Sequence, residues 1–129
     1  SERGAKRAIL LPVSAPFHSP LMRPAREGLE PRLRETSFLD PEVPVVSNVD
    51  ARPVRDGAAA RDALIRQVDS PVRWVESVRW MAGEGGAARF VEIGPGAVLS
   101  GLVRRILDGP RPVPAGEVDG LDDLLARIA

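Results

Sequence analysis

The 129-residue sequence contains no cysteine, no tyrosine and a single histidine, His18. Without cysteine the chain has no disulfide scaffold, no thiolate metal site and no cysteine nucleophile. No apolar run approaches the roughly 20 residues that a membrane-spanning helix needs. A surplus of one charge is also missing, because 18 Lys and Arg balance 18 Asp and Glu. This balance argues against a nucleic-acid-binding protein, which needs a basic surface.

The first residues carry neither an initiator methionine nor the shape of a signal peptide, since the sequence begins Ser1-Glu2-Arg3-Gly4. We therefore expect a cytoplasmic chain that is a piece of a longer protein. Its shares of hydrophobic residues (43%) and of charged residues (28%) are typical of a folded globular protein.

Short apolar runs alternate with helical repeats along the chain. Continuous apolar segments predict strands, and a four-residue apolar spacing predicts helices. The expected strands are 8–13, 43–49 and 88–93, and the expected helices are 24–33, 58–67, 70–82, 98–107 and 121–128. Strands separated by helices indicate an α/β fold with parallel pairing.

Proline and glycine positions refine these boundaries. Pro31 is expected to kink the first helix or to end its first half. Ser70 and Pro71 are expected to begin the third helix, as its N-cap and its first residue. Residues 50–57 are expected to form a loop, and residues 110–116 a Pro/Gly-rich linker.

His18 is the natural candidate for proton transfer, because unperturbed histidine titrates near neutral pH. It follows a predicted buried strand and stands between Pro16 and Pro20, which stiffen the backbone that aims its ring. The alternative is an ordinary loop histidine that is hydrogen-bonded to a carbonyl group.

A histidine base needs a nucleophile, and no serine here lies in a Gly-x-Ser-x-Gly turn. Ser100 falls inside the strongest helical repeat. Ser19 is the immediate neighbour of His18, and adjacent side chains rarely align for a hydrogen bond. The nucleophile is therefore expected outside this sequence.

Gly94-Pro95-Gly96 lies between a predicted strand and a predicted helix, where free N–H groups attract anions. Because the segment is short, a tight turn that needs small residues is the preferred interpretation. No His, Asp or Glu cluster has the spacing of a metal site.

Four motifs follow one another at characteristic spacing: residues 11–22 (LPVSAPFHSPLM), 44–50 (PVVSNVD), 67–74 (QVDSPVRW) and 92–99 (EIGPGAVL). Together they resemble the C-terminal part of the malonyl-CoA:acyl-carrier-protein transacylases, over roughly residues 8–108. The sequence from residue 110 onward resembles nothing in particular.

The resemblance implies a two-step transfer, in which a serine takes malonyl from coenzyme A and passes it to the phosphopantetheine thiol of holo acyl carrier protein. His18 would match the catalytic histidine, which deprotonates the serine and returns the proton to the departing thiol. Gln67 would match the residue whose main-chain carbonyl orients that histidine. The resemblance implies no cofactor beyond the substrate malonyl-CoA, and neither nucleic acid nor a membrane is expected as a partner.

Phe17 is expected to bind substrate. In related acyltransferase domains of polyketide synthases, Phe before the histidine accompanies malonyl and Ser accompanies methylmalonyl. A bulky ring beside the acyl site would exclude the α-methyl group by overlap. The alternative role of Phe17 is hydrophobic cover of the loop.

The resemblance also implies an α/β fold. Residues 1–16 would be the end of a small ferredoxin-like subdomain, contributing its last strand. Residues 17–109 would be the C-terminal part of a larger hydrolase-like subdomain with a parallel sheet, and residues 110–129 a linker and a C-terminal helix. The family's nucleophilic serine, its malonyl-binding arginine and its oxyanion-hole loop have no counterpart here, so the chain alone is expected to be inactive.

The leading hypothesis is a partial malonyl transacylase of fatty-acid biosynthesis. One alternative is a fragment of a polyketide synthase acyltransferase domain, which ketosynthase-like flanking linkers would indicate. The other is a non-catalytic module that binds the carrier protein, whose affinity would survive replacement of His18 by alanine.

Overall fold

The structure is a computed structural model that describes residues 4, 10, 12–109, 112–116 and 121–128. Helices and short strands alternate along it. The elements are η1 (Pro20–Met22), α1 (Arg23–Glu35), β1 (Val45–Val46), β2 (Pro53–Val54), α2 (Gly57–Gln67), α3 (Trp74–Ala82), β3 (Val91–Ile93), α4 (Val98–Ile106), β4 (Val113–Gly116) and α5 (Leu121–Ile128).

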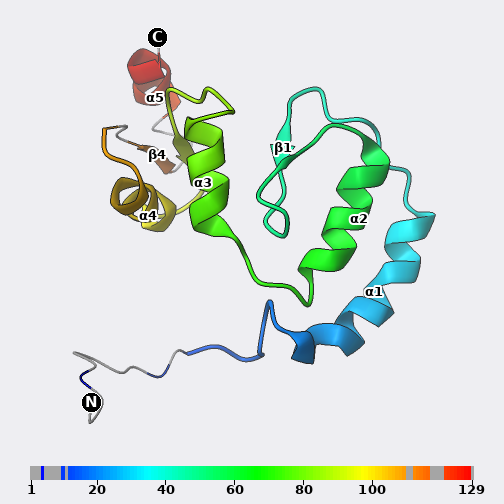
Figure 1. The fold of residues 1–129 in the computed structure, drawn as a ribbon. Helices are drawn as coiled ribbons and strands as arrows, with labels where there is room; N and C mark the ends of the chain where they lie inside the picture. Colours follow the sequence, from blue (N-terminus) through cyan, green and yellow to red (C-terminus); the bar gives the residue numbers. More distant parts are fainter. Residues whose placement is uncertain (1–3, 5–9, 11, 110–111, 117–120, 129) are drawn as a thin grey trace.

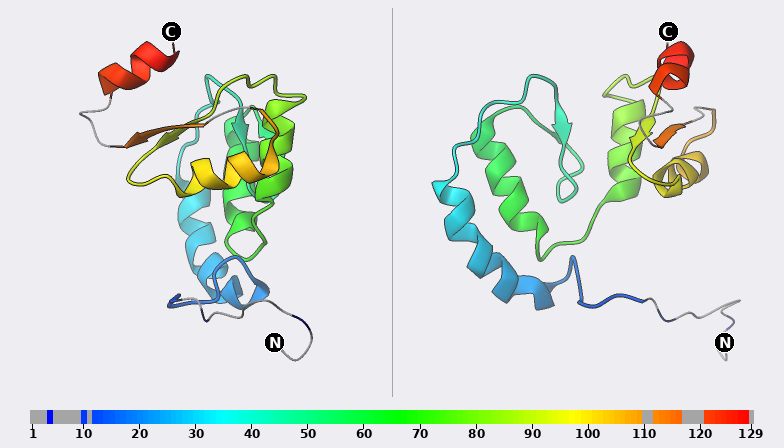
Figure 2. Two further views of the ribbon diagram at one scale, coloured as in Figure 1. Left: turned by 90° about the vertical axis from the view of Figure 1, so that its left-hand side faces the viewer. Right: turned by 180° about the vertical axis from the view of Figure 1, so that it is seen from behind.

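These elements gather in two groups (Figure 1). In the first, α1 lies beside α2, which also contacts β2 of the β1–β2 hairpin. In the second, α4 lies against α3 and β3, and β3 pairs with β4. Figure 2 shows that the connection between α2 and α3 runs from one group to the other, close to the turn that precedes η1. The candidate site forms where these two segments meet.

Helices α1 and α2 follow the predicted repeats. Asp56 is the N-cap of α2, and its carboxylate accepts a hydrogen bond from the Ala59 N–H at 2.7 Å. Of the two effects expected of Pro31, a kink or an end to the first half of the helix, the second is wrong, because α1 continues to Glu35. Pro31 removes one hydrogen bond from the helix, and the ion pair between Glu30 and Arg34 at 2.6 Å spans the same turn.

The predicted start of the third helix is also wrong. Helix α3 begins at Trp74, three residues after Pro71, although it ends as predicted before Gly83. The main-chain N–H of Arg73 donates to the carbonyl of Asn48 at 2.9 Å. This contact with a distant turn holds the residues before Trp74 in an extended connection, so tertiary contact overrides the local capping signal.

Strand pairing corrects two further expectations. The predicted loop 50–57 contains β2, which pairs antiparallel with β1. The predicted linker 110–116 contains β4, which pairs parallel with β3. Strands β3 and β4 with the intervening α4 form a βαβ unit, so the expected parallel pairing is present there. The composition of this segment suggested a linker, because prolines flank Val113. The N–H of Val113 nevertheless donates a hydrogen bond to the Phe90 carbonyl at 2.9 Å.

The strand expected at residues 8–13 falls mostly on residues that the structure does not describe. Leu10, Pro12 and Val13 are described, and none of them is in a strand. Leu10 is 97% exposed, so a buried strand is wrong for these three residues. No strand of the described ranges lies beside them to pair with their main chain.

The core of the described residues is small, and many large apolar side chains are exposed. The apolar face of α4 is an example, since Val103 is buried but Val98 is 72% exposed. Ile93, at the end of β3, is 88% exposed. The buried apolar side chains are Ala51, Ala63, Ile65, Val78, Val103 and Leu124. Across the described ranges, no helix combines the length and the apolar character needed to cross a membrane.

Gly57 begins α2 where the chain leaves no room for a side chain. A Cβ atom there would overlap the main-chain oxygen of Phe38, and the Gly57 N–H donates to the Asp40 carboxylate at 2.8 Å. We expect Gly57→Ala to lower the free energy of unfolding by about 1–3 kcal/mol, because the backbone must move to admit the methyl group. Urea unfolding of the chain measures this difference.

Gly28 in α1 is the matched control, because a Cβ there has no neighbouring atom within 4 Å. Gly28→Ala is expected to raise the free energy of unfolding by about 0.5–1 kcal/mol, as alanine favours the helix over glycine. Equal effects of the two substitutions would contradict the packing described at Gly57.

Candidate active site

His18 lies in an exposed turn directly before η1. Its ring nitrogen Nδ1 is 3.0 Å from the main-chain oxygen of Gln67. A carbonyl oxygen accepts hydrogen bonds only, so Nδ1 carries the proton and Nε2 keeps its lone pair. The structure thus brings together two residues that are 49 positions apart, and it leaves Nε2 available as a base.

The backbone at His18 lies in the left-handed region, with a φ of 55°. Residues other than glycine adopt this conformation rarely, and local hydrogen bonds hold it here. The Phe17 N–H donates to the Ala15 carbonyl at 2.9 Å, and the Ser19 hydroxyl donates to the Pro16 carbonyl at 2.8 Å. Backbone held in such a conformation is frequent at functional sites.

Gln67 is the last residue of α2, and its carbonyl is one of the groups that a helix leaves without an intrahelical partner. The C-terminal end of a helix carries a partial negative charge, which favours a nearby cation. The His18 ring therefore meets α2 at its partially negative end, through the carbonyl oxygen of Gln67. The contact uses the main chain of Gln67 and does not depend on its side-chain amide.

Among the described residues, no serine hydroxyl is hydrogen-bonded to the His18 ring. Ser100 is buried in α4, with 1% exposure. The Ser19 hydroxyl is bonded to the Pro16 carbonyl, and the one hydrogen bond of the His18 ring within the described ranges is that to Gln67. Phe17, the residue before His18 in the chain, is 58% exposed, so its side chain is accessible from solvent.

Asp50, in the turn between β1 and β2, pairs with Arg66, the residue before Gln67. Both guanidinium–carboxylate distances are 2.6 Å, so the contact is bidentate. The hydrogen bond from Arg66 holds the pKa of the Asp50 carboxyl below its usual range. The Ser47 hydroxyl, 3.2 Å from the same carboxylate, acts in the same direction. Asp50 therefore stays ionised and ties this turn to the end of α2.

The connection between α2 and α3 is held at further points. The Arg73 N–H donates to the Asn48 carbonyl at 2.9 Å, and the Arg73 guanidinium donates to the Asp50 carbonyl at 3.2 Å. Midway along the connection, Asp69 pairs with Arg26 of α1 at 3.4 Å, and its side chain is only 9% exposed. The segment that begins at the end of α2 is thus attached to the β1–β2 turn at both ends and to α1 in between.

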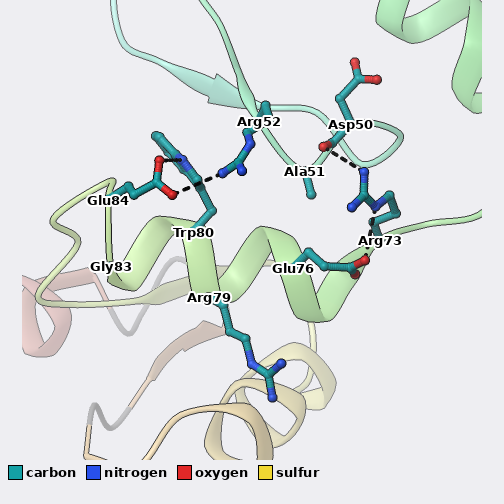
Figure 3. Close-up of a pocket in the computed structure, with 9 residues that line it drawn as sticks. All are labelled: Asp50, Ala51, Arg52, Arg73, Glu76, Arg79, Trp80, Gly83 and Glu84. Carbon is teal, nitrogen blue, oxygen red and sulfur yellow. Dashed lines mark hydrogen bonds and ion pairs between the residues drawn. The ribbon is translucent and has the colours of Figure 1, made fainter.

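A hollow of about 470 Å³ lies between the β1–β2 turn and α3. Figure 3 shows the side chains that line it. Its lining side chains bind one another. Arg52 lies 3.4 Å from Glu84, and the indole N–H of Trp80 donates to the same carboxylate at 3.0 Å. Three arginines and three acidic residues line the hollow, so neither charge is in excess. None of the predicted site residues lines it.

The turn Gly94-Pro95-Gly96 does not leave the N-terminus of α4 open to an anion. The Glu92 carboxylate accepts hydrogen bonds from the main-chain N–H groups of Leu99 at 3.0 Å and Ser100 at 2.7 Å. Gly94 and Gly96 have φ values of 130° and 87°, as a tight turn of small residues requires. Within the described ranges, no three His, Asp or Glu side chains are grouped to hold a metal ion.

Comparison with known proteins gives this geometry a context. The chain is 50% identical over 105 residues to the malonyl CoA-acyl carrier protein transacylase of Salmonella typhimurium, which is 81% of this chain and 34% of that relative. The crystal structure of an acyl carrier protein S-malonyltransferase from Vibrio cholerae matches with a TM-score of 0.87 and 46% identity. This match covers 95% of this chain and 40% of the other.

The chain is homologous to part of the malonyl CoA-acyl carrier protein transacylases. The resemblance drawn from the four motifs is confirmed, as is the mixed helix and strand architecture of this family. The chain spans about a third of the length of the curated relatives it matches. A further match, at 41% identity and a TM-score of 0.86, is a malonyl-transacylase in complex with its type II PKS acyl-carrier protein. No protein-family model matches the chain.

Sequence reasoning missed the residues that hold the end of α2 beside His18. Asp50 was expected only as the first residue of a loop, and Arg66 falls in an expected helix without any feature that sets it apart from the other arginines. They lie 16 positions apart, and Asp69 and Arg26 lie 43 apart. No periodic pattern links residues at such separations, so only the position of Arg66 next to Gln67 offered a signal.

Glu92 provides a pH-dependent test of this part of the transacylase fold. Hydrogen bonds from Ser100 and Leu99 hold the pKa of the Glu92 carboxyl below its usual range. Stability from a lowered carboxyl pKa is fully present above the unfolded-state pKa and is lost as the pH falls through the folded-state pKa. We therefore expect Glu92→Gln to lower the urea midpoint at neutral pH, and the difference from the parent chain to shrink as the pH falls below the usual range of a glutamate carboxyl.

The exposed Glu42 serves as the control, and Glu42→Gln should leave the urea midpoint nearly unchanged at neutral and at acid pH. If the Glu92→Gln difference were the same at neutral and acid pH, the capping contact to α4 would not be ionic.

Proposed function

We propose that this chain is the base-carrying part of an enzyme that transfers malonyl from coenzyme A to acyl carrier protein. The contact of 3.0 Å between His18 Nδ1 and the Gln67 carbonyl carries the proposal, because it selects the tautomer that a general base needs. The reaction is proposed because this chain is 50% identical to a malonyl transacylase over 105 residues. His18 is the proposed catalytic base, Gln67 the residue that orients it, and Phe17 the substrate-binding residue.

In the proposed first step, a serine hydroxyl from the rest of the enzyme gives its proton to Nε2 of His18 and attacks the thioester carbonyl of malonyl-CoA. The imidazolium then returns the proton to the departing coenzyme A thiolate. In the second step, the phosphopantetheine thiol gives its proton to His18 and attacks the malonyl-serine ester, and the imidazolium returns that proton to the departing serine oxygen. In both steps the ring meets α2 at its partially negative end, through the Gln67 carbonyl. No cofactor is needed beyond the substrate malonyl-CoA.

Holo acyl carrier protein is the proposed acceptor. The neighbour that is a malonyl-transacylase in complex with its type II PKS acyl-carrier protein supports a carrier protein as partner. It also favours polyketide synthesis as the second candidate pathway beside fatty-acid biosynthesis. The proposal includes a cytoplasmic location, where coenzyme A thioesters are substrates, and involves neither nucleic acid nor a membrane.

The proposal includes an arrangement of subdomains. Residues 1–16 would be the end of a small ferredoxin-like subdomain, residues 17–109 the C-terminal part of the hydrolase-like subdomain, and residues 110–129 a linker and helix. The exposure of Ile93 and Val98 supports a larger protein around the chain, because apolar side chains of this size are usually covered.

A chimera tests the role of His18. In it, this chain follows the part of the Salmonella typhimurium transacylase that precedes the matched region. We expect His18→Ala to lower kcat for malonyl transfer by about 10²–10⁴-fold, with little change in KM for malonyl-CoA, because the base acts in the transition state. Gln67→Ala keeps the main-chain carbonyl, so its kcat should stay within about threefold of the parent.

Two further measurements give this test its controls. The isolated 129-residue chain should show no malonyl adduct by intact mass after incubation with malonyl-CoA, since no described serine contacts His18. Full activity of the His18→Ala chimera would refute the proposal. An inactive parent chimera that still binds holo acyl carrier protein would favour the non-catalytic binding module.

The same chimera tests the role of Phe17. We expect Phe17→Ser to raise the ratio of kcat/KM for methylmalonyl-CoA over malonyl-CoA by roughly 10-fold or more, because the ring no longer overlaps the α-methyl group. Phe17→Leu keeps most of the bulk and should retain the malonyl preference. An unchanged ratio in Phe17→Ser would show that the ring only covers the turn.

A further inference from the structure

We infer that Asp50 is a positioning residue for His18, acting through Arg66 and the main-chain carbonyl of Gln67. Its catalytic consequence depends on the proposed function, whereas its effect on the imidazole can be measured without any activity. Asp50 does not contact His18. It fixes the acceptor that selects which ring nitrogen of His18 carries the proton.

The carboxylate of Asp50 supplies the first attachment. It holds Arg66 through two contacts of 2.6 Å, and the Ser47 hydroxyl at 3.2 Å fixes its direction. The pair is partly exposed, with 36% of the Asp50 and 45% of the Arg66 side chain accessible. Pairs this exposed contribute little to stability, but a bidentate contact still restricts geometry. Its effect should therefore appear in the orientation of Gln67 more than in the unfolding of the chain.

The main chain of Asp50 supplies the second attachment. Its carbonyl accepts a hydrogen bond from the Arg73 guanidinium at 3.2 Å, as Figure 3 shows. Arg66 and Arg73 stand at the two ends of the connection between α2 and α3. Asp50 binds both of them, so this one residue holds both ends of the connection. The turn around it is rigid, because Ala51 is 3% exposed, has a φ of 53° and donates its N–H to the Ser47 carbonyl at 2.9 Å.

The position of the Gln67 carbonyl decides the state of the imidazole. A contact of 3.0 Å is near the optimum for a hydrogen bond, and the bond weakens steeply with distance and angle. If the carbonyl moves away, Nδ1 loses its acceptor and the proton is free to occupy Nε2. With its proton on Nε2, a neutral His18 cannot accept a proton at that nitrogen from a nucleophile.

The experiment uses the fact that His18 is the only histidine of the chain. Nitrogen NMR of the 129-residue chain, labelled with ¹⁵N-histidine and recorded where the imidazole is neutral, reports the ratio of the two tautomers. We expect the Nδ1–H form to predominate in the parent chain. Asp50→Ala and Asp50→Asn should each lower the Nδ1–H to Nε2–H ratio by roughly two- to tenfold, the range that one hydrogen bond provides. Asp50→Glu keeps the carboxylate, so its Nδ1–H to Nε2–H ratio should lie between that of Asp50→Ala and that of the parent chain.

Arg52→Ala is the matched control, because Arg52 lies in the same turn and pairs with Glu84 instead of the α2–α3 connection. It should leave the tautomer ratio unchanged. If Asp50→Ala unfolds the chain, Asp50→Asn and Arg66→Lys decide the question, since both nearly keep the side-chain volume. An unchanged ratio in these variants, an equal shift in Arg52→Ala, or a parent chain without the Nδ1–H form would overturn the inference.

The chimera separates this inference from the proposed function. There Asp50→Asn should lower kcat, leave KM for malonyl-CoA nearly unchanged and be partly rescued in Asp50→Glu. If the tautomer ratio shifts but His18→Ala leaves the chimera active, the positioning role of Asp50 stands and the proposed catalytic role of His18 fails. If His18→Ala abolishes transfer while Asp50→Asn changes neither kcat nor the tautomer ratio, the positioning role fails alone.

Discussion

The hydrogen bond from His18 Nδ1 to the last carbonyl of α2 is the constraint on which the candidate site depends. A histidine base needs one acceptor to fix its tautomer and some negative charge to stabilise its protonated form, and these are often supplied by an aspartate. Here the acceptor is the carbonyl at the C-terminus of α2, the end of a helix that carries a partial negative charge. The geometry therefore depends on how firmly the end of α2 is held.

Residues far apart in the chain hold that end. Asp50 reaches it from the β1–β2 turn, and Arg26 reaches the connection that follows it from α1. The Asp50–Arg66 pair is partly exposed, so it adds little to the free energy of unfolding. Its physical effect is restraint, because a bidentate pair limits rotation and translation of the backbone beside it. The Arg26–Asp69 pair is a single contact of 3.4 Å, and the Asp69 side chain is only 9% exposed. The chain thus keeps a precise contact although its apolar core is small.

Local signals predicted the helices better than the strands. The alanine-rich repeat before Gln67 and the apolar repeat after Val98 each became a helix close to the expected range. Strands β2 and β4 were missed because each exists only through its partner, and their prolines suggested loops. The start of α3 was misplaced because the Arg73 N–H binds a distant carbonyl, which no local capping rule includes.

The sequence by itself determined which family the chain resembles, because four motifs in one order need no coordinates to be compared. It also determined that His18 is the only imidazole available and that Gln67 is the residue to examine beside it. Only the tertiary structure decided the tautomer of His18, the ionic brace at Asp50 and the cap that Glu92 places on α4. The physical reason is distance along the chain. Each of these contacts joins groups that no local sequence pattern relates, so they come within hydrogen-bonding distance only when the chain folds.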